Sequence, residues 1–272
     1  MAFQSKPNYF QSGVRYRKII AALILMIAFW GFGAQKAIAQ RRSFIQENLG
    51  HYDHKPYHFG FSLGFNKMNF ALRPVESFYE LNENHQPNGI FGPLQTVLPR
   101  QDFGFHIGIV SNLKLSPMLD LRFVPTLSFG DRYIDYQYTR LSTDGPASGT
   151  ISQQFEATFI DFPVHLKYKS VRIINSRAYV LGGLKFSTDL SSNQYKDEGD
   201  EGIIYARTLK NDFHYELGVG FDHYFYFFKF STEIKASFGL RNLILPGESN
   251  PIFTNSIDRL NSKIIMVSFL FE

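Results

Sequence analysis

Strict two-residue alternation of apolar and polar side chains is the feature that most constrains how this chain can fold. In residues 57–66, YHFGFSLGFN, the odd positions carry Tyr, Phe or Leu and the even positions carry His, Gly, Ser or Asn. Successive side chains of a β-strand point to opposite faces, so this pattern predicts a strand with unlike environments on its two faces. The segment alone fits a soluble sandwich with an aromatic core, or a transmembrane barrel with its aromatic residues against lipid.

Seven further segments repeat this pattern. We expect the eight strands at residues 57–72, 102–115, 119–130, 159–169, 177–187, 212–223, 226–239 and 263–272. Most of them are close to the ten residues or so that a tilted strand needs to cross a bilayer.

The connections between these strands alternate between long and short. Long ones of roughly 20 residues or more follow the first, third, fifth and seventh strands, and short ones lie at 116–118, 170–175 and near Tyr224. Up-and-down barrels of the outer membrane have short periplasmic turns and long outer loops, whereas a Greek-key sandwich has no reason to sort its loops. The sequence therefore predicts an all-β fold, an eight-stranded antiparallel up-and-down transmembrane β-barrel at 57–272, with both of its ends on the periplasmic side.

The N-terminus has the features of a cleavable signal peptide, residues 1–39. A basic stretch precedes an apolar run at 19–32, and Ala37 and Ala39 form an A-x-A cleavage site. The run is shorter than the roughly 20 residues of a membrane-spanning helix, although an uncleaved anchor is the alternative. Residues 40–56 would then be a periplasmic N-terminal tail.

Charge and cysteine content exclude several classes of protein. The formal net charge is +4, but five of the 28 basic residues and none of the 24 acidic ones lie in residues 1–39, so the remaining chain has a net charge of −1. A nucleic-acid partner is therefore not expected. The absence of Cys excludes disulfide bonds and the lipid anchor of bacterial lipoproteins.

The barrel hypothesis assigns a side to each residue of the strands. We expect lipid contacts at Phe59, Phe61, Phe65, Phe105, Phe123, Phe162, Phe221, Phe230, Phe269 and Phe271. We expect a polar network in the lumen at His58, His106, Asp120, Arg122, Asp161, His165, Lys167, Lys185, His214, Glu216, Asp222, Glu233 and Lys235. We expect interfacial aromatic girdles at Tyr57, Phe70, Tyr133, Tyr168 and Tyr224. Eight strands enclose only enough space for side chains, so a packed interior is expected, with a narrow ion path as the alternative.

No motif in the sequence selects an enzyme, a cofactor or a metal site. The densest histidine cluster, at 51–58, contains Pro56 and runs into a strand, which does not suit metal ligation. Paired glycines such as those in GVGFDH lie within strands, not at the strand-to-helix turn of a nucleotide site. Acids, bases and hydroxyls are numerous, but no spacing singles out a catalytic set. A non-catalytic protein is therefore expected.

The last strand suggests one class of partner. Barrels of the bacterial outer membrane commonly end in an aromatic residue that the outer-membrane assembly machinery recognises. Phe269 and Phe271 fit this pattern, but Glu272 follows them, so the match is close but incomplete. Lipid of the outer membrane is the other expected partner.

Three segments resemble the PorT family of Bacteroidetes outer-membrane β-barrels, called SprT in gliding species. They are DHKPYHFGFSLGFNKMNF (53–70), the pair FIDFPVHLKYKS (159–170) and RAYVLGGLKFSTDL (177–190), and FHYELGVGFDHYFYFFKFSTEIKASFGLRNL (213–243). The second and third of these segments also resemble the broader porin-like barrels of that phylum and do not distinguish between the two. The first segment, with Asp53, Lys55 and Pro56 before the strand, is the one that favours PorT. The resemblance implies an accessory role in the type IX secretion system, gliding motility in some species, other secretion proteins as partners, and no catalytic residue. A narrow porin-like channel for small solutes or ions is the alternative.

Overall fold

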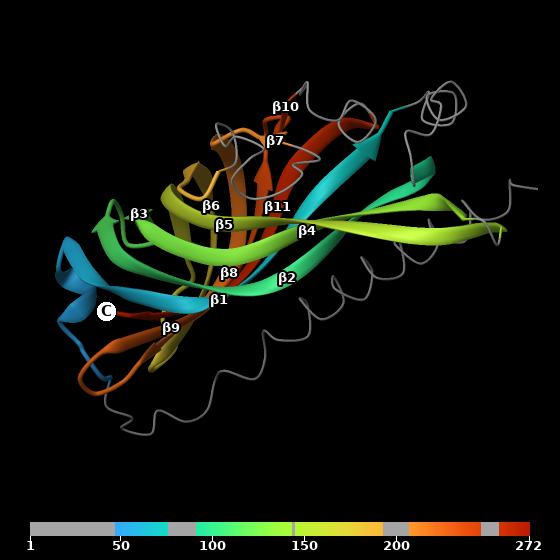
Figure 1. Ribbon diagram of the computed structural model, residues 1–272. Helices are drawn as coiled ribbons and strands as arrows, with labels where there is room; N and C mark the ends of the chain where they lie inside the picture. Colours follow the sequence, from blue (N-terminus) through green and yellow to red (C-terminus); the bar gives the residue numbers. More distant parts are fainter. Residues whose placement is uncertain (1–46, 76–90, 143–144, 193–206, 246–255) are drawn as a thin grey trace, which may run out of the picture. The chain divides into compact units, whose positions relative to one another are not determined.

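The computed structural model describes residues 47–75, 91–142, 145–192, 207–245 and 256–272 (Figure 1). The predicted signal peptide, with Ala37 and Ala39, lies outside the described residues. Residues Glu47–Glu272 form one compact unit, and the description below concerns this unit alone. No helix among the described residues is long and apolar enough to cross a membrane.

The unit consists almost entirely of antiparallel strands. They are β1 (Tyr57–Pro74), β2 (Phe91–Lys114), β3 (Leu119–Phe123), β4 (Thr126–Ser142), β5 (Gly145–Lys169), β6 (Ser176–Asp189), β8 (Asn211–Tyr224), β9 (Lys229–Gly239) and β11 (Ile257–Phe271). Two short strands, β7 (Arg207–Thr208) and β10 (Ile244–Leu245), pair with each other, and a short 3-10 helix, η2 (Tyr52–His54), precedes β1.

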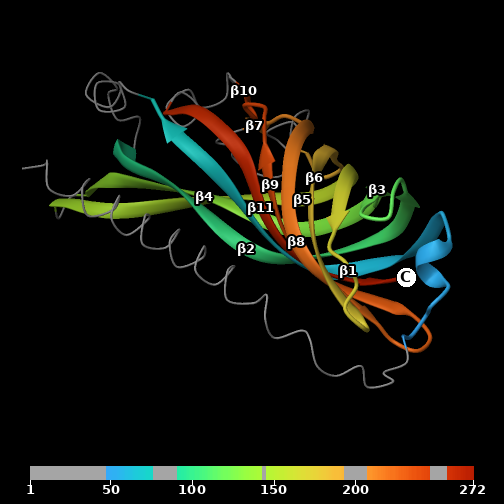
Figure 2. The ribbon, with the colours of Figure 1, turned by 180° about the vertical axis from the view of Figure 1, so that it is seen from behind.

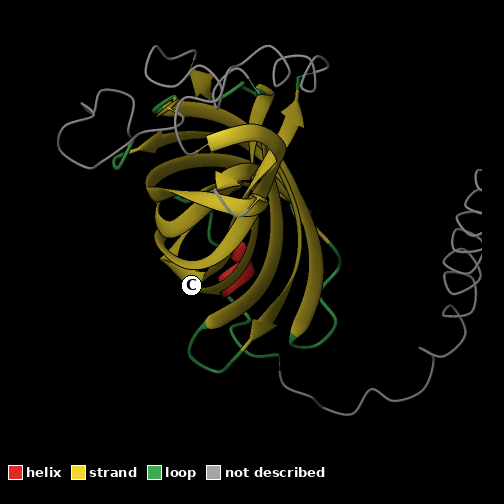
Figure 3. Cartoon of the chain, turned by 45° about the vertical axis from the view of Figure 1, so that its right-hand side comes forward, coloured by secondary structure: helices red, strands yellow, loops and turns green. Residues whose placement is uncertain are grey.

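The sheet closes into a ring. Each main strand pairs with its neighbours along the chain, and β11 also pairs with β1, where Phe61 lies opposite Phe271 and Arg73 opposite Arg259. Closure removes the free edges that an open sheet would expose. Figure 2, from behind, and Figure 3, an oblique view, show the sheet curving round on itself. The predicted eight-stranded up-and-down barrel is confirmed, with β3 and β4 counted as one interrupted strand.

The interruption lies at Val124–Pro125. Proline has no backbone N–H and cannot donate to a β-ladder. The predicted third strand is therefore divided into two. Its first part, β3, pairs with β2 and β5 near the turn that connects it to β2, and its second part, β4, pairs with the same two strands from Thr126 onward.

Two ends of the barrel can be distinguished (Figure 1). The turn end carries the three short connections 115–118, 170–175 and 225–228, together with the start of β1 and the end of β11. The loop end carries the connections that follow β1, β4, β6 and β9.

One predicted long loop is wrong. Instead of about 20 residues between the third and fourth strands, only 143–144 separate β4 from β5, and the two strands form a long hairpin that projects from the loop end (Figure 1). Similarly, β2 begins at Phe91, within a stretch expected to be a loop. The Gly, Pro, Ser and Thr residues near 142–150 predicted a connection there. The connection is much shorter than expected, because β4 extends to Ser142 and β5 begins at Gly145.

The projecting strands escaped prediction because their polarity is inverted. In the membrane-length part of β4 the outward row is apolar, with Leu127 and Phe129, but beyond it the outward row carries Asp131 and Asp135. The inward row changes in the opposite sense, from Ser128 and Arg132 to the fully buried Ile134 and Tyr136. This inversion is what a strand that leaves lipid for water requires, since its apolar face must then turn inward.

The interior of the loop end is an apolar core. It contains Phe70, Leu94, Val97, Ile134, Tyr136, Phe155, Leu243, Ile257 and Leu260. The girdle prediction is therefore wrong for Phe70, and it is also wrong for Tyr224, which is buried at the turn end. Both side chains point inward, because each residue lies two positions along its strand from another buried residue: Phe70 from Met68, and Tyr224 from Asp222.

Candidate functional site

All thirteen residues expected in the lumen have buried side chains. They come from seven of the eight strands of the ring and lie on the inward rows. Buried charges require partners, since an unpaired ion in a low-dielectric interior is very costly. The structure supplies a partner for each lysine, arginine and carboxylate among them, in several connected groups.

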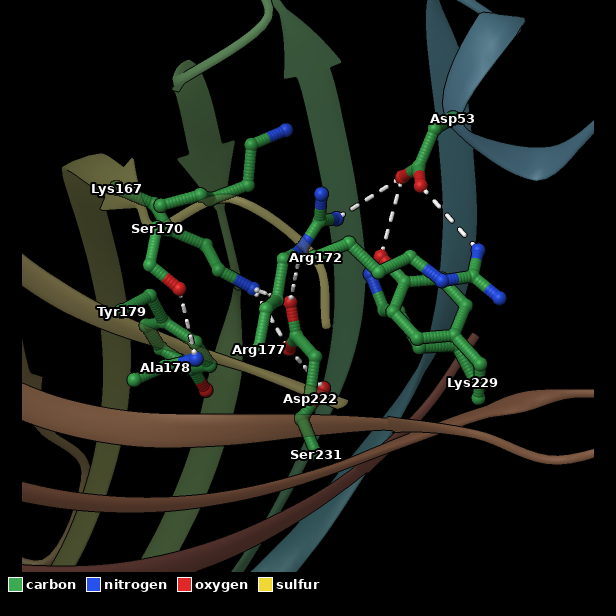
Figure 4. Close-up of polar contacts among 12 residues, drawn as sticks. Asp53, Lys167, Ser170, Arg172, Arg177, Ala178, Tyr179, Asp222, Lys229 and Ser231 are labelled. Atoms are coloured by element: carbon green, nitrogen blue, oxygen red, sulfur yellow. Dashed lines mark hydrogen bonds and ion pairs between the residues drawn. The ribbon is translucent and has the colours of Figure 1, made fainter. Parts of the chain in front are cut away.

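Asp222 of β8 is the centre of the first group (Figure 4). Lys167 Nζ lies 2.9 Å from both of its carboxylate oxygens, and Arg177 Nε donates to Oδ2 at 3.1 Å. The hydroxyl of Ser231 adds a bond of 2.6 Å to Oδ1. One carboxylate thus binds groups from β5, β6 and β9 and connects these strands across the lumen.

Arg122 of β3 is the centre of the second group. Its Nη1 lies 3.0 Å from Glu233 Oε2 and its Nη2 lies 3.1 Å from Glu272 Oε1. The hydroxyl of Tyr179 donates to Glu233 at 2.8 Å, and Lys167 lies over the Tyr179 ring at 3.6 Å. The two groups are therefore in contact through Tyr179.

Lys185 of β6 is the centre of a third group, in the middle of the barrel. Its Nζ lies 3.5 Å from Asp161 and 3.3 Å from Glu216. His165 Nε2 lies 2.6 Å from the other oxygen of Glu216. Ser128 and Ser187 donate to Asp161. Acids and bases are mixed, so the lumen has no single sign of charge.

Arg132 of β4 marks the passage from this polar interior to the apolar core of the loop end. Its guanidinium stacks on the rings of Phe70 and Phe159, at 4.3 and 5.0 Å, and lies 3.8 Å from Asp189. Arginine suits this position because its planar group packs against aromatic rings while keeping its charge.

The segment before β1 fills the mouth of the turn end. Asp53 lies 3.0 Å from Arg177 and 3.4 Å from Arg172, and it accepts a 3.0 Å hydrogen bond from Tyr224 (Figure 4). Burial alone would raise the pKa of Asp53, but these partners, with Arg177 first, lower it. The expected free tail is therefore held in the barrel mouth from Glu47 onward.

Tyr52 and Glu272 close the same mouth. Glu272 accepts a 3.0 Å hydrogen bond from the Tyr52 hydroxyl, and Lys229 Nζ lies 2.8 Å from the same oxygen. Burial would raise the pKa of Glu272, but Lys229 and Arg122 outweigh it and lower the pKa to about 2.

Sequence reasoning missed several members of these groups. Lys229 and Arg177 lie within the predicted strands 226–239 and 177–187, on the inward rows of Glu233 and Lys185, but they were not assigned to the lumen network. Tyr52 and Asp53 lie outside any periodic segment. Glu272 was considered only as a departure from the aromatic end of the last strand.

One interior cavity among the described residues is small. Its volume is about 10 Å³, and it lies among Ser62, His106, Asp161, Lys185, Glu216 and Lys235. A volume of this size holds about one water molecule. The ion pairs and hydrogen bonds around this cavity connect the strands across the lumen.

One set of side chains resembles a catalytic triad. Ser237 lies 3.2 Å from His214 Nδ1, and His214 Nε2 lies 3.3 Å from Asp212. All three residues are buried. A nucleophile must reach its substrate, so in this closed arrangement the set acts as a polar contact between β8 and β9. No three metal-ligating side chains come together in the described part of the chain.

The residues expected to face lipid lie on the outward rows. Phe59, Phe61, Phe65, Phe105, Phe123, Phe162 and Phe221 are exposed. Phe230, Phe269 and Phe271 are half-buried because they cover one another at the end of the barrel seam, with ring centroids 6.1 Å apart for Phe230 and Phe269 and 5.2 Å apart for Phe230 and Phe271.

The comparison with protein families agrees with this architecture. Residues 34–245 match the family described as outer membrane protein beta-barrel domain. Among solved structures, the crystal structure of the outer membrane protein OprG from Pseudomonas aeruginosa is similar at 10% identity and a TM-score of 0.38, covering 78% of this chain and 92% of that one. A search of curated proteins found no match.

Proposed function

The chain belongs to the family of outer-membrane β-barrel domain proteins, and from this premise we propose that it is a non-catalytic barrel with a closed lumen. The observation that carries this proposal is that the interior is filled along its length. Phe70, Ile134 and Leu260 pack together in the loop end, ion pairs fill the middle, and Tyr52 and Glu272 meet in the turn end.

We further propose that the turn end faces the periplasm. Short turns on the periplasmic side are the rule for barrels of this kind, and the three short connections lie at the same end as the start of β1 and the end of β11. The projecting β4–β5 hairpin would then reach out of the cell.

A closed barrel contributes a rigid frame, so its activity is expected at its ends, where loops and turns bind partners. The process that we propose is protein secretion by the type IX system, which supports gliding in some species. The support is the resemblance of three segments to the PorT family; the family match itself names an outer-membrane barrel and no secretion role.

Deletion of the gene followed by mass spectrometry of the secreted proteins tests this role. We expect proteins with a C-terminal sorting domain to be lost from the cell surface and the medium, and to return when the intact gene is restored. Normal export in the deletion strain would exclude the secretion role and leave the barrel assignment intact.

The second candidate is a narrow channel for small solutes or ions. Family membership supports it at least as well as the secretion role, and the specific observation in its favour is the continuous set of ionisable groups in the lumen, from Glu272 through Glu233 and Lys235 to Lys185. The arrangement described here would then be its closed state.

Conductance in a planar bilayer separates the two candidates. A closed barrel should carry no stable open current, whereas the double variant Tyr52→Ala/Glu272→Ala should raise the current by loosening the turn end. Glu156→Gln, a change of an exposed residue, is the control. A stable nanosiemens-scale current through the unaltered protein would favour the channel and exclude the closed frame.

A further inference from the structure

Three basic side chains lie on one outward face of the barrel seam, spread along it toward the loop end. They are Lys67 of β1 and Arg259 and Lys263 of β11, here called the seam patch. The register of the two strands places Asn69 opposite Lys263 and Arg73 opposite Arg259, so all of these positions lie on one outward face. Arg259 and Lys263 are exposed and Lys67 is half-buried.

The seam patch begins where the apolar outer surface stops. Phe65 precedes Lys67 on the outward row of β1, and Ile265 follows Lys263 on that of β11; both apolar residues are exposed. Lys67 Nζ lies 5.0 Å from the centre of the Phe103 ring, which belongs to the same apolar surface. In a membrane this is the level at which acyl chains give way to headgroups.

The charges of the seam patch are not neutralised by the protein. Within the described ranges, no carboxylate lies within ion-pairing distance of Lys67, Arg259 or Lys263, and the closest ion pair joins Arg73 to Asp258 at 3.6 Å. Asp258 meets the charge of Arg73, which lies opposite Arg259, but in the part of the chain that the structure describes no carboxylate meets the charges of the three residues of the seam patch. An external anion would supply the missing counter-charge.

The opposite side of the same rim differs. On β2, β4 and β5 the outward polar residues are mostly acidic or neutral, and they satisfy one another. Arg100 pairs with Asp135 at 3.1 Å, Ser152 donates to Asp135 at 2.6 Å, and Gln154 donates to Asp131 at 3.0 Å. Of these two sides of the rim, as far as the structure describes them, the seam is the one that carries positive charge without a carboxylate partner.

We propose that the seam patch, which is spread along the strand, binds the phosphates of a multiply phosphorylated glycolipid of the outer leaflet, with the acyl chains of the lipid lying on Phe65, Ile265 and Val267. Two features select this occupant: the charge is complementary to phosphate, and the patch is continuous with the lipid-facing surface. The inference rests on the proposed orientation, with the loop end outside.

Lipid binding by the purified full-length barrel in a neutral detergent tests the proposal. The probe is diphosphoryl lipid A, compared with lipid A stripped of its phosphates and with inorganic phosphate, and the readout is native mass spectrometry with titration. We expect the phosphorylated lipid to bind at least tenfold more tightly than either comparison ligand. Equal binding of the two lipids, or of inorganic phosphate and the lipid, would overturn the proposal.

Matched variants locate the binding site. The triple variant Lys67→Gln/Arg259→Gln/Lys263→Gln should lose about tenfold in affinity, and the loss should shrink in high salt. The control Lys55→Gln/Arg100→Gln/Lys210→Gln removes the same charge from exposed residues elsewhere and should bind as the parent does. Equal affinities of the two triple variants would overturn the proposal.

Two further measurements keep the outcome unambiguous. Folding of each variant is verified by its heat-dependent migration on gels, and if the seam triple variant fails to fold, Lys263→Gln alone should still weaken binding by about threefold. Orientation is tested separately by protease added to intact cells, which should cut the β4–β5 hairpin if the loop end is outside. A failed lipid assay thus excludes the seam patch as a lipid site and leaves the proposed function untouched.

Discussion

The hydroxyl of Tyr52 donates a 3.0 Å hydrogen bond to Glu272, so that the segment before the first strand meets the last residue of the sequence, 220 positions away. The contact lies beside the β1–β11 seam. It connects the closing of the ring to the filling of its mouth, because Tyr52 lies just before β1 and Glu272 just after β11, the two strands that close the ring.

Removal of this hydrogen bond should weaken the closed barrel. A hydrogen bond to a charged group contributes about 1.5–3 kcal/mol, so Tyr52→Phe should lower the free energy of unfolding by about that amount in urea titrations of the protein in detergent micelles. Tyr226→Phe, at an exposed tyrosine of the turn end, is the control. An equal effect of the two changes would show that the hydrogen bond to Glu272 contributes nothing specific.

Acid should open the turn end in a defined range. The pKa of Glu272 falls from its ordinary 4.5 to about 2, with Lys229 and Arg122 outweighing the effect of burial. A group with a depressed pKa contributes stability that is complete above its ordinary pKa and is lost as the pH falls through its folded-state pKa. The urea midpoint should therefore decline between about pH 4.5 and 2.

Glu272→Gln tests the source of this decline. The variant should be less stable than the parent at pH 7 and should lose less on acidification. Asp53, whose pKa is also lowered, should leave a residual decline in the variant. Parallel pH profiles of parent and variant would show that Glu272 is not the titrating group.

The Asp222 group should show strong coupling. Removing one partner of a buried ion pair typically costs about 3–5 kcal/mol because the other charge remains buried and unpaired. We therefore expect Asp222→Asn and Lys167→Met each to be strongly destabilising, and the double variant to be less so than the sum. Unfolding free energies of the four proteins in a double-mutant cycle give the coupling; strict additivity would contradict the 2.9 Å contact as an energetic unit.

Neighbouring residues of β1 should respond oppositely to substitution. Phe61 is exposed on the outward row and Ser62 is buried on the inward row. Phe61→Arg should cost about 2–4 kcal/mol in a bilayer, as for a charge near the middle of the membrane, whereas Ser62→Ala should cost little. Folding into lipid vesicles, followed by urea unfolding, measures both. A small effect of Phe61→Arg would show that this row does not contact lipid.

Close packing of the strands at the seam should make Gly64 sensitive to substitution. A Cβ atom at Gly64 would lie 2.1 Å from the carbonyl oxygen of Val267 across the seam, whereas one at Gly182 would meet nothing nearer than 3.4 Å. Gly64→Ala should therefore destabilise the barrel by about 1–3 kcal/mol, as overpacking does, and Gly182→Ala should be close to neutral. Heat-dependent gel migration and urea unfolding compare them. Equal stability of the two variants would mean that the seam can widen without cost.

The sequence by itself determined the class of fold and the side to which most strand residues point. Alternation with a period of two is a local property, and strands of membrane-spanning length with short turns leave few ways to bury or expose two unlike faces. For this reason Phe59 and Asp222 could be assigned to opposite faces without knowledge of the tertiary structure.

Only the tertiary structure decided where that pattern stops and what fills the interior. Apolar side chains face outward where a strand lies in lipid and inward where it lies in water. The direction of the Phe70 side chain and the extent of the β4–β5 hairpin therefore could not be predicted without knowing where the membrane-spanning part of each strand ends. The pairing of Asp222 with Lys167 and Arg177, and of Glu272 with Arg122 and Tyr52, depends on the stagger of eight strands around a ring. That stagger arises from closure of β11 onto β1, a contact between residues some 200 positions apart, which no local pattern records.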